Sequence, residues 1–380
     1  MREKGEKLMK KWIALLLCAA LLLAASACTK QLNPSSLGAS SLQSEGGSSE
    51  IPDDDDLTPD TGGTLVLYTW ISVFPQTVLD EFTAETGIAV DYQTFDRESV
   101  MLSQIDANRP YDYDLIVAND STVEGIIQKG LAQKLDRSKL ANWENINPLY
   151  QGLSLDPQDE YTVPYGAAVQ SIVYSPASVG EITGYADLWN AILKDKLGLV
   201  PDAQVVVGMA LKAVEESYGT TDKASIEKAG EKLMELVPNV KAISDMELPQ
   251  KLASGEIGAA VMYPTQALSA VVANEELKLV FPKEGTGFGV QEAFIPANAP
   301  NPDAAHAFLD FILRPEIAAR CFEYLGFAST NRSADSLLSA FYQPLLSLPK
   351  NYIELEHLTP SAAQADLDAV WKEFRAACEK

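Results

Sequence analysis

The stretch TLVLYTWISVFPQTVLDEFTAETGIAVDYQ, residues 64–93, decides the class of fold. Thr64–Thr69 is a short apolar run that predicts a strand. Pro75 then opens an amphipathic segment that ends before Gly87, and these two residues are typical of a helix start and a helix end. Ile88–Gln93 predicts the next strand. Strand, helix and strand in this order indicate the beginning of an α/β domain.

The same alternation continues along the chain. A helix is expected at Ser99–Ala107, a strand at Asp112–Ala118 and a helix at Val123–Leu131, which predicts a mostly parallel sheet covered on both faces. A second series begins near Gln170–Tyr174. Its further strands are expected at 197–200, 239–243, 257–263 and 277–281, and its helices at about 186–194, 204–217, 224–236, 248–255 and 264–273. The C-terminal third is mainly helical.

The N-terminus carries export signals. WIALLLCAALLLAASAC, residues 12–28, follows the basic start MREKGEKLMKK, which is typical of a secretory signal and predicts its removal as residues 1–27. The apolar core is shorter than the roughly 20 residues that a spanning helix needs. The ending ASAC resembles the lipobox of bacterial lipoproteins, which would make Cys28 the lipidated first residue. The alternative is an ordinary cleaved signal with an incidental cysteine.

Residues 29–62 contain Ser, Gly, Asp and Pro with almost no large apolar residue, including the run Asp53–Asp56. Such a segment cannot bury enough surface to offset its ordering entropy, so residues 28–62 are expected to be a lipidated cysteine and a disordered tether. The protein is then expected outside the cytoplasm, lipid-anchored to the outer face of the cell membrane or periplasmic. The remaining residues suffice for two domains.

The charge of the chain excludes nucleic-acid partners. The formal net charge is −24, and it becomes −27 when residues 1–27, with five basic and two acidic side chains, are removed. This negatively charged surface repels phosphate backbones. Most of the negative charge is explained by a solvated acidic coat that keeps an exported protein soluble. Cys321 and Cys378 remain in the mature chain, and both a disulfide and separate thiols are open. No metal-ligand spacing is present, and we expect no metal and no cofactor.

Ligand positions are expected directly after the strands. In open α/β sheets, ligands bind beyond the carboxyl ends of strands, where the strand order switches. The segments that follow predicted strands here are 70–74, 119–121, 201–202, Tyr263 and 287–292.

Several segments together resemble the spermidine/putrescine-binding family of ABC-importer receptors. They are LVLYTW at 65–70, EFTAETGIAVDYQTF at 81–95, YDYDLIVAND at 111–120, LAQKLDRSKLANWENINP at 131–148, YTVPYG at 161–166, YADLWN at 185–190, VPNVKAI at 237–243, FPKEGTGF at 281–288, IPANA at 295–299 and AFLDFILRPEIAARCFEYLGFASTN at 307–331. The resemblance runs from about residue 64 to 375. It implies a type II periplasmic-binding-protein fold, in which two lobes close by hinge bending around a ligand.

The resemblance also implies the lobes, the partners and the function. Lobe 1 is expected to hold residues 62–166 plus 292–331, and lobe 2 residues 167–291 plus 332–380. The expected function is that of an extracytoplasmic substrate-binding lipoprotein, acting as a monomer, that captures spermidine or putrescine and delivers it to ABC permease subunits. The expected partners are thus a small molecule, the permease and, through the lipid, the membrane.

The family's pocket positions are matched in part. Trp70 stands at an aromatic position, Asp202 at a carboxylate that pairs with an amine, and Tyr263 where the family has a tryptophan. Asn119 and Ser121 replace a serine and a tyrosine, with Asp120 between them. The resemblance therefore assigns these six residues to the ligand pocket.

Other pocket positions depart from the family. Gln291 stands at the principal amine-binding aspartate, and Glu292 beside it is included in the expected site although neighbouring strand residues point to opposite faces. Val205 replaces an acid, Gly289 a tryptophan and Phe327 a tyrosine. We expect a roomier and less anionic pocket than that of a close polyamine receptor, with Asp202 as the main ammonium contact.

Three alternatives differ from this reading in ligand or in class. The same type of receptor could bind another small solute, such as a ligand with one cationic end, through Asp202 and Gln291. A signalling or adhesive lipoprotein without transport is the second alternative. An enzyme is the third, and against it stand only two histidines and the absence of a Gly-x-Ser-x-Gly elbow or a zinc-ligand motif. We expect no catalytic residues.

Overall fold

The computed structural model describes residues 63–105, 112–244, 246–348, 355–357 and 361–380, all of which belong to one compact unit, Thr58–Lys380. The predicted signal 1–27 and the whole of the predicted lipidated cysteine and tether, residues 28–62, lie outside the described residues. Within the described part of the chain, no helix has the length and the apolar character to cross a membrane.

The first sheet begins with three parallel strands, as the sequence predicts. β1 (Thr64–Trp70) pairs with β2 (Ala89–Phe95) on one side and with β3 (Leu115–Asn119) on the other. The full order is β11-β4-β10-β3-β1-β2, with β12 also paired to β10. The added strands are β4 (Thr162–Val169), β10 (Thr286–Phe294), β11 (Ala328–Ser329) and β12 (Leu355–His357).

The prediction of a mostly parallel sheet is wrong beyond these three strands, because the sheet is mixed. β10 runs antiparallel to both β3 and β4. The reason is the path of the chain: β4 leads out of the first sheet toward β5 of the second, whereas β10 returns from the second sheet and so runs in the opposite direction. Antiparallel return strands of this kind are common in large α/β sheets.

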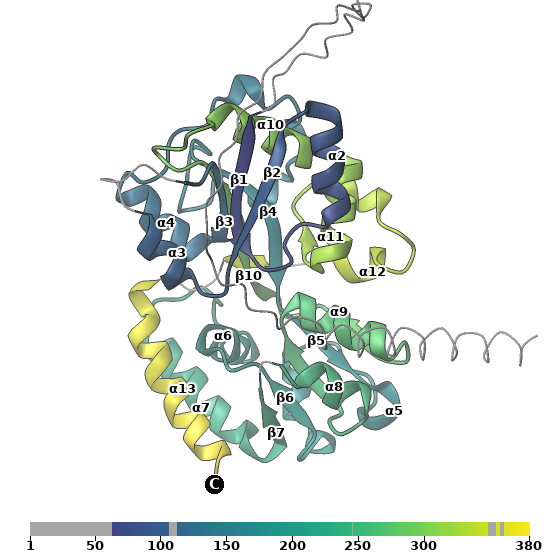
Figure 1. The fold of residues 1–380 in the computed structure, drawn as a ribbon. Coiled ribbons are helices and arrows are strands. Elements are labelled where there is room, and N and C mark those ends of the chain that lie inside the picture. Colours follow the sequence, from purple (N-terminus) through teal and green to yellow (C-terminus); the bar gives the residue numbers. More distant parts are fainter. Residues whose placement is uncertain (1–62, 106–111, 245, 349–354, 358–360) are drawn as a thin grey trace, which may run out of the picture. The chain divides into compact units, whose positions relative to one another are not determined.

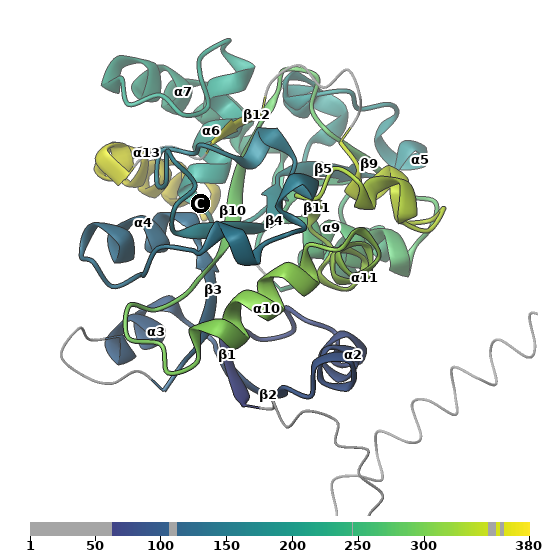
Figure 2. The same ribbon diagram turned by 90° about the horizontal axis from the view of Figure 1, so that it is seen from above.

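Helices cover both faces of the first sheet. Side chains of β1 alternate, so that Leu65 and Leu67 belong to one core and Tyr68 to the other. The first core is built with α2 (Gln76–Thr86), α10 (Pro302–Ile312) and α11 (Pro315–Leu325), and the second with α3 (Glu98–Gln104) and α4 (Asp120–Gln128). Figures 1 and 2 show these two groups of helices on opposite faces of the sheet.

The second sheet has the order β7-β6-β8-β5-β9 and is mixed as well. Its strands are β5 (Ser171–Tyr174), β6 (Leu197–Leu199), β7 (Val240–Ile243), β8 (Ala259–Met262) and β9 (Lys278–Val280). The helices around it are α5 (Pro176–Val179), α6 (Ala203–Ala213), α7 (Lys223–Leu236), α8 (Leu248–Ala253), α9 (Pro264–Ala273) and α13 (Gln364–Cys378). The buried α6 lies between this sheet and the pair α7 and α13 (Figure 1).

The helix predicted at 186–194 is wrong. Two short 3₁₀ turns, Tyr185–Trp189 and Ala191–Leu193, take its place. Asn190 separates them, since its backbone is extended and its side chain accepts a hydrogen bond from the backbone N–H of Ile192. A side chain that caps a new turn competes with continuation of the helix.

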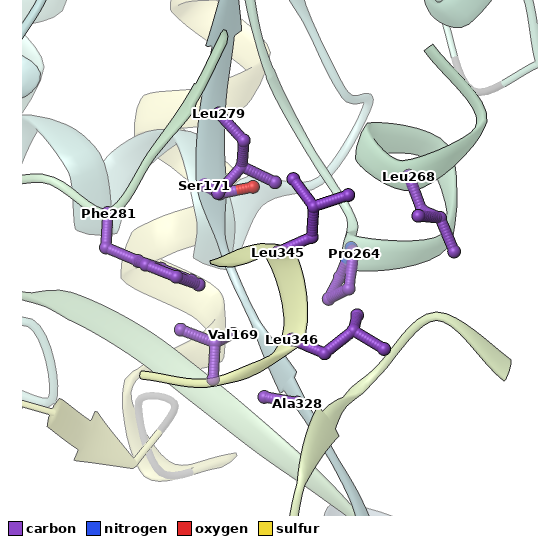
Figure 3. Close-up of a pocket in the computed structure, with 9 residues that line it drawn as sticks. All are labelled: Val169, Ser171, Pro264, Leu268, Leu279, Phe281, Ala328, Leu345 and Leu346. Carbon is purple, nitrogen blue, oxygen red and sulfur yellow. The ribbon is translucent and has the colours of Figure 1, made fainter. Parts of the chain in front are cut away.

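The chain passes between the sheets at Gln170 and again at residues 281–285. A small apolar cavity of about 10 Å³ lies here, and Val169, Ser171 and Phe281 face it together with Leu345 and Leu346 of α12, Gln343–Leu346 (Figure 3). Cys321, buried in the first core, and Cys378 at the end of α13 are both free. Burial raises the pKa of the Cys321 thiol to about 12, so it is an inert core residue.

Candidate functional site

A cavity of about 490 Å³ is lined by residues that belong to the elements of both sheets. Its volume lies in the range that small-molecule sites usually have. It contains seven of the eight residues predicted for the ligand site; only Glu292 is not on its wall. The lining residues are Trp70, Asn119, Asp120, Ser121, Ala168, Gln170, Asp202, Gln204, Tyr263, Thr265, Gln266, Gly289, Val290, Gln291 and Phe327.

Asp202 is fixed at the start of α6. One carboxylate oxygen accepts hydrogen bonds from the backbone N–H groups of Gln204 and Val205, at 2.8 and 3.2 Å. The other oxygen accepts a hydrogen bond from the Tyr263 hydroxyl at 2.7 Å. The helix N-terminus favours a negative charge at this position. Asp202 is therefore both the N-cap of a buried helix and an oriented carboxylate in the cavity wall.

Two aromatic side chains enclose the cavity from different sheets. Trp70, the last residue of β1, packs on Phe95 with ring centroids 4.8 Å apart. Its indole Nε1 is buried and has no hydrogen-bond partner among the described residues. Tyr263 ends the β8 segment and precedes α9. An aromatic face and a carboxylate thus lie together at Tyr263 and Asp202, whereas Trp70 supplies the aromatic face on the other side.

The segment Asn119–Ser121 leads from β3 into α4. The backbone N–H of Asn119 donates to Glu98 Oε1 at 2.7 Å, and Thr122 Oγ1 donates to the same carboxylate. Burial raises the pKa of Glu98 above its ordinary value. Asp120 is only 4% exposed, and its oxygens accept hydrogen bonds from the backbone N–H groups of Ser121 and Val290, each at 2.7 Å. These contacts fix the turn that places Asp120 on the cavity wall.

Gln291 and Glu292 are neighbours on β10 but lie in different surroundings. Gln291 lines the cavity, is 7% exposed, and its Oε1 has no hydrogen-bond partner among the described residues. The pairing of β10 with β4 shifts in register between these two residues. Glu292 nevertheless stays off the cavity wall, 1% exposed, and burial raises its pKa well above the ordinary value, with the charge of Asp120 as the next cause.

Sequence reasoning missed several polar lining residues. Gln170 occupies the single position between β4 and β5, Gln204 lies in the first turn of α6, and Thr265 and Gln266 lie in the first turn of α9. The signal that could have found them is the one used for Asp202 and Tyr263, because all four directly follow a strand or open the next helix. Val205, in contrast, is fully buried in the second core and is absent from the cavity wall.

The chemistry of the wall is that of a binding site. In the described ranges, no group of three or more His, Cys, Asp or Glu side chains is arranged to hold a metal ion. His306 is buried in α10, where its Nε2 accepts a hydrogen bond from the backbone N–H of Asp136 at 2.8 Å. Carboxylates, amides and aromatic faces can bind a cationic or polar molecule by charge-assisted hydrogen bonds and stacking.

Two mixed α/β sheets, between which the chain passes more than once, carry a polar cavity and define a substrate-binding protein with the type II periplasmic fold. The chain belongs to the family of bacterial extracellular solute-binding proteins, whose profile matches residues 77–348, and within it to the spermidine/putrescine-binding proteins of ABC transporters. The resemblance found in the sequence is thus confirmed. Members of this family are binding proteins and not enzymes.

Three known proteins illustrate the relationship. The spermidine/putrescine-binding periplasmic protein of Salmonella typhimurium is 36% identical over 278 residues, which are 73% of this chain and 80% of that protein. Its namesake from Escherichia coli is 34% identical over 282 residues, 74% of this chain and 81% of that protein. The structure of PotD, the spermidine/putrescine ABC transporter substrate-binding protein of Streptococcus pneumoniae, has a TM-score of 0.75 at 28% identity and covers 83% of this chain and 99% of its own.

Proposed function

We propose that this protein is an extracytoplasmic lipoprotein that captures a polyamine, spermidine or putrescine, and delivers it to the permease subunits of an ABC importer. The names of its Salmonella and Escherichia relatives support a polyamine as the ligand. The name of the Streptococcus structure supports an ABC transporter as the partner.

The observation that carries the proposal is the oriented carboxylate of Asp202 in a cavity with aromatic walls. A polyamine is a flexible methylene chain with ammonium groups, so it needs a fixed negative charge and apolar faces along the chain. Asp202 supplies the charge, and the Tyr263 hydroxyl fixes the orientation of this carboxylate by donating a hydrogen bond to it at 2.7 Å. Trp70 offers its face to the methylenes and to a neighbouring cation, a contact that contributes about 0.5–2 kcal/mol.

The remaining wall residues complete the proposed ligand site. Asn119, Ser121 and Gln291 carry amide and hydroxyl groups that accept hydrogen bonds from ammonium N–H donors. We keep Glu292 as a proposed site residue, although its side chain is buried behind the cavity wall and does not line the cavity. No cofactor is needed for this binding chemistry.

We propose that binding closes two lobes, residues 62–166 plus 292–331 and residues 167–291 plus 332–380. A ligand that contacts both lobes binds the closed state better than the open one and shifts the population toward it. The side chain of Thr265, at the start of α9, donates to the backbone oxygen of Leu325 at 2.9 Å, a contact between elements of the two sheets. The closed shape is then what the permease recognises.

Anchoring completes the proposal. Lipidation of Cys28 and the tether to residue 62 keep a monomeric receptor on the outer face of the cell membrane, near its permease. The acidic net charge favours cationic solutes and disfavours a nucleic-acid partner.

Calorimetric titration of the purified mature chain with putrescine and spermidine tests this function. We expect saturable binding of at least one of them, and a thermal-shift screen should agree, because a ligand at 100 times its Kd stabilises the folded state by about 2.7 kcal/mol. Absence of binding by both polyamines would overturn the polyamine assignment. Binding of a solute with one cationic end instead would support the alternative in which Asp202 and the neutral Gln291 hold the two ends.

A further inference from the structure

We propose that Tyr92 is a positioning residue of the ligand site: its hydroxyl group fixes the turn after β1 and thereby holds Trp70 in the cavity wall. Tyr92 lies on β2 and does not line the cavity, so it acts on the ligand through Trp70 and not by direct contact. Its effect on binding rests on the proposed function, in which Trp70 contacts the ligand.

The hydroxyl group of Tyr92 uses all of its hydrogen-bonding capacity on this one turn. It accepts hydrogen bonds from the backbone N–H groups of Val73 and Phe74, at 3.1 and 3.3 Å. It also donates a long hydrogen bond, at 3.5 Å, to the backbone oxygen of Trp70. A tyrosine hydroxyl has one proton to donate and two lone pairs to accept with. A single side-chain atom thus joins the end of β1 to the residues that precede α2.

The two backbone donors have no other acceptor among the described residues. Val73 is 1% exposed and Phe74 2% exposed, and both belong to the core formed with α2, α10 and α11. Water has little access to their N–H groups, and a buried N–H group without an acceptor is unfavourable. The turn in its present form therefore depends on the Tyr92 hydroxyl.

The backbone of the turn is held in an unfavourable conformation. Ser72 has φ 60°, in the left-handed region that residues other than glycine rarely adopt. Ile71 beside it is 72% exposed, so its side chain contributes little packing to the turn. Such a conformation persists only where the surrounding contacts determine it. Two tyrosine hydroxyls supply such contacts: that of Tyr92, and that of Tyr165, which donates to the backbone oxygen of Val73 at 3.1 Å.

Trp70 is the wall residue that directly precedes this turn. Its indole Nε1 has no hydrogen-bond partner among the described residues, so the ring is placed by packing on Phe95 and by the position of its own backbone. On one side that backbone continues β1, where Trp70 pairs with Phe95 of β2. On the other side it enters the turn that Tyr92 holds. Loss of the hydroxyl should let the turn relax and move the indole relative to the cavity.

Tyr92→Phe is the test variant, because it removes the hydroxyl group and keeps the ring that packs edge-on against Phe74. Without ligand, we expect a shifted Trp70 fluorescence emission and faster quenching by acrylamide, each obtained as the difference from the corresponding Trp70→Phe protein. In titration calorimetry, putrescine should bind about tenfold more weakly, a change of the size that one hydrogen bond contributes. Tyr185→Phe is the matched control: it removes another buried hydroxyl, hydrogen-bonded to Thr286 and absent from the cavity wall, and should leave both quantities unchanged.

A double-mutant cycle separates positioning from a general loss of stability. In a Trp70→Ala background, Tyr92→Phe should change the putrescine Kd by less than about twofold, because two residues that act through one contact are not additive. An equal weakening in both backgrounds, or an unchanged Trp70 fluorescence, would overturn the positioning role.

The remaining outcomes are also decisive. If Tyr92→Phe does not fold, Tyr165→Phe takes its place in the fluorescence comparison, since it removes the donor to Val73 in the same turn; an unchanged Trp70 emission there would overturn the proposal. Absence of putrescine binding by the wild type would overturn the proposed function itself. The fluorescence comparison needs no ligand and still decides whether Tyr92 positions Trp70.

Discussion

Asp202→Asn separates the two tasks that the structure gives to this side chain. Asp202 caps α6 through the backbone N–H groups of Gln204 and Val205, and it presents a negative charge to the cavity. Asparagine is about as good an N-cap as aspartate, so the cap survives the change. The amide group can also keep a hydrogen bond with the Tyr263 hydroxyl, which acts as donor or acceptor. Only the charge is lost.

The expected effect on binding is large and the effect on stability is small. Loss of one partner from a desolvated charge pair costs about 2–5 kcal/mol of binding free energy. This corresponds to a weakening of the polyamine Kd by about 30- to 4,000-fold. The free energy of unfolding should change by less than about 0.5 kcal/mol, because the N-cap is kept.

Titration calorimetry with putrescine and spermidine measures the first quantity, and urea unfolding without ligand measures the second. Asp222→Asn is a matched control, since Asp222 caps α7 by accepting from the Ser225 N–H at 2.9 Å and does not line the cavity. Asp202→Ala should weaken binding similarly and also cost about 1 kcal/mol of stability through the lost cap. Wild-type affinity in Asp202→Asn would refute the assigned role.

Three further predictions concern other parts of the chain. Ser171→Ala should stabilise the folded state by about 1 kcal/mol in urea unfolding, because the Ser171 hydroxyl is buried without a hydrogen-bond partner among the described residues; a loss of stability would show that the hydroxyl is needed. The free energy of unfolding of Glu292→Gln should rise relative to that of the wild type as pH increases from 5 to 8. Because the pKa of Glu292 is raised in the folded state, the folded wild type keeps a proton that the unfolded chain has released. This lowers the wild-type free energy of unfolding by up to about 1.4 kcal/mol per pH unit, and glutamine has no such dependence. Equal differences in unfolding free energy at both pH values would contradict this. Cys28→Ala should release the protein from membranes in a fractionation assay, and unchanged retention with normal N-terminal processing would exclude the lipid anchor.

The sequence predicted those strands and helices well whose position follows from their own residues, through an apolar run or through residues typical of a helix start or end. The apolar run of β1 and the helix from Pro75 to Gly87 are observed, and Gly87 takes the left-handed conformation (φ 73°) that a helix end requires. The direction of β10 was not predictable in this way, because it depends on which sheet the chain returns from. The side chain of Asn190, which divides a predicted helix into two turns, is a local signal that periodicity alone does not reveal.

The cavity was predictable for a related reason. Strand ends meet at one edge of each sheet, so residues far apart in sequence, such as Trp70 and Tyr263, line one cavity. Gln170 escaped notice because it belongs to no element and joins two sheets, a role that only the topology reveals. The predicted lobe boundaries remain predictions, since the sheet in which a strand lies does not by itself define which residues move together.

The charge of the cavity wall is the property that a comparison of sequence positions with the family describes least well. Counting acids at family positions left Asp202 as the main ammonium contact, because Val205 and Gln291 are neutral. In space, Val205 is a core residue of α6 and does not line the cavity, so its neutrality does not alter the wall. Asp120 does line it, at the start of α4, and its carboxylate accepts a hydrogen bond from the backbone N–H of Val290 in β10, the neighbour of Gln291. Because an electrostatic interaction depends on distance and solvent exposure, and not on sequence position, a carboxylate on a neighbouring element contributes negative charge to the same cavity.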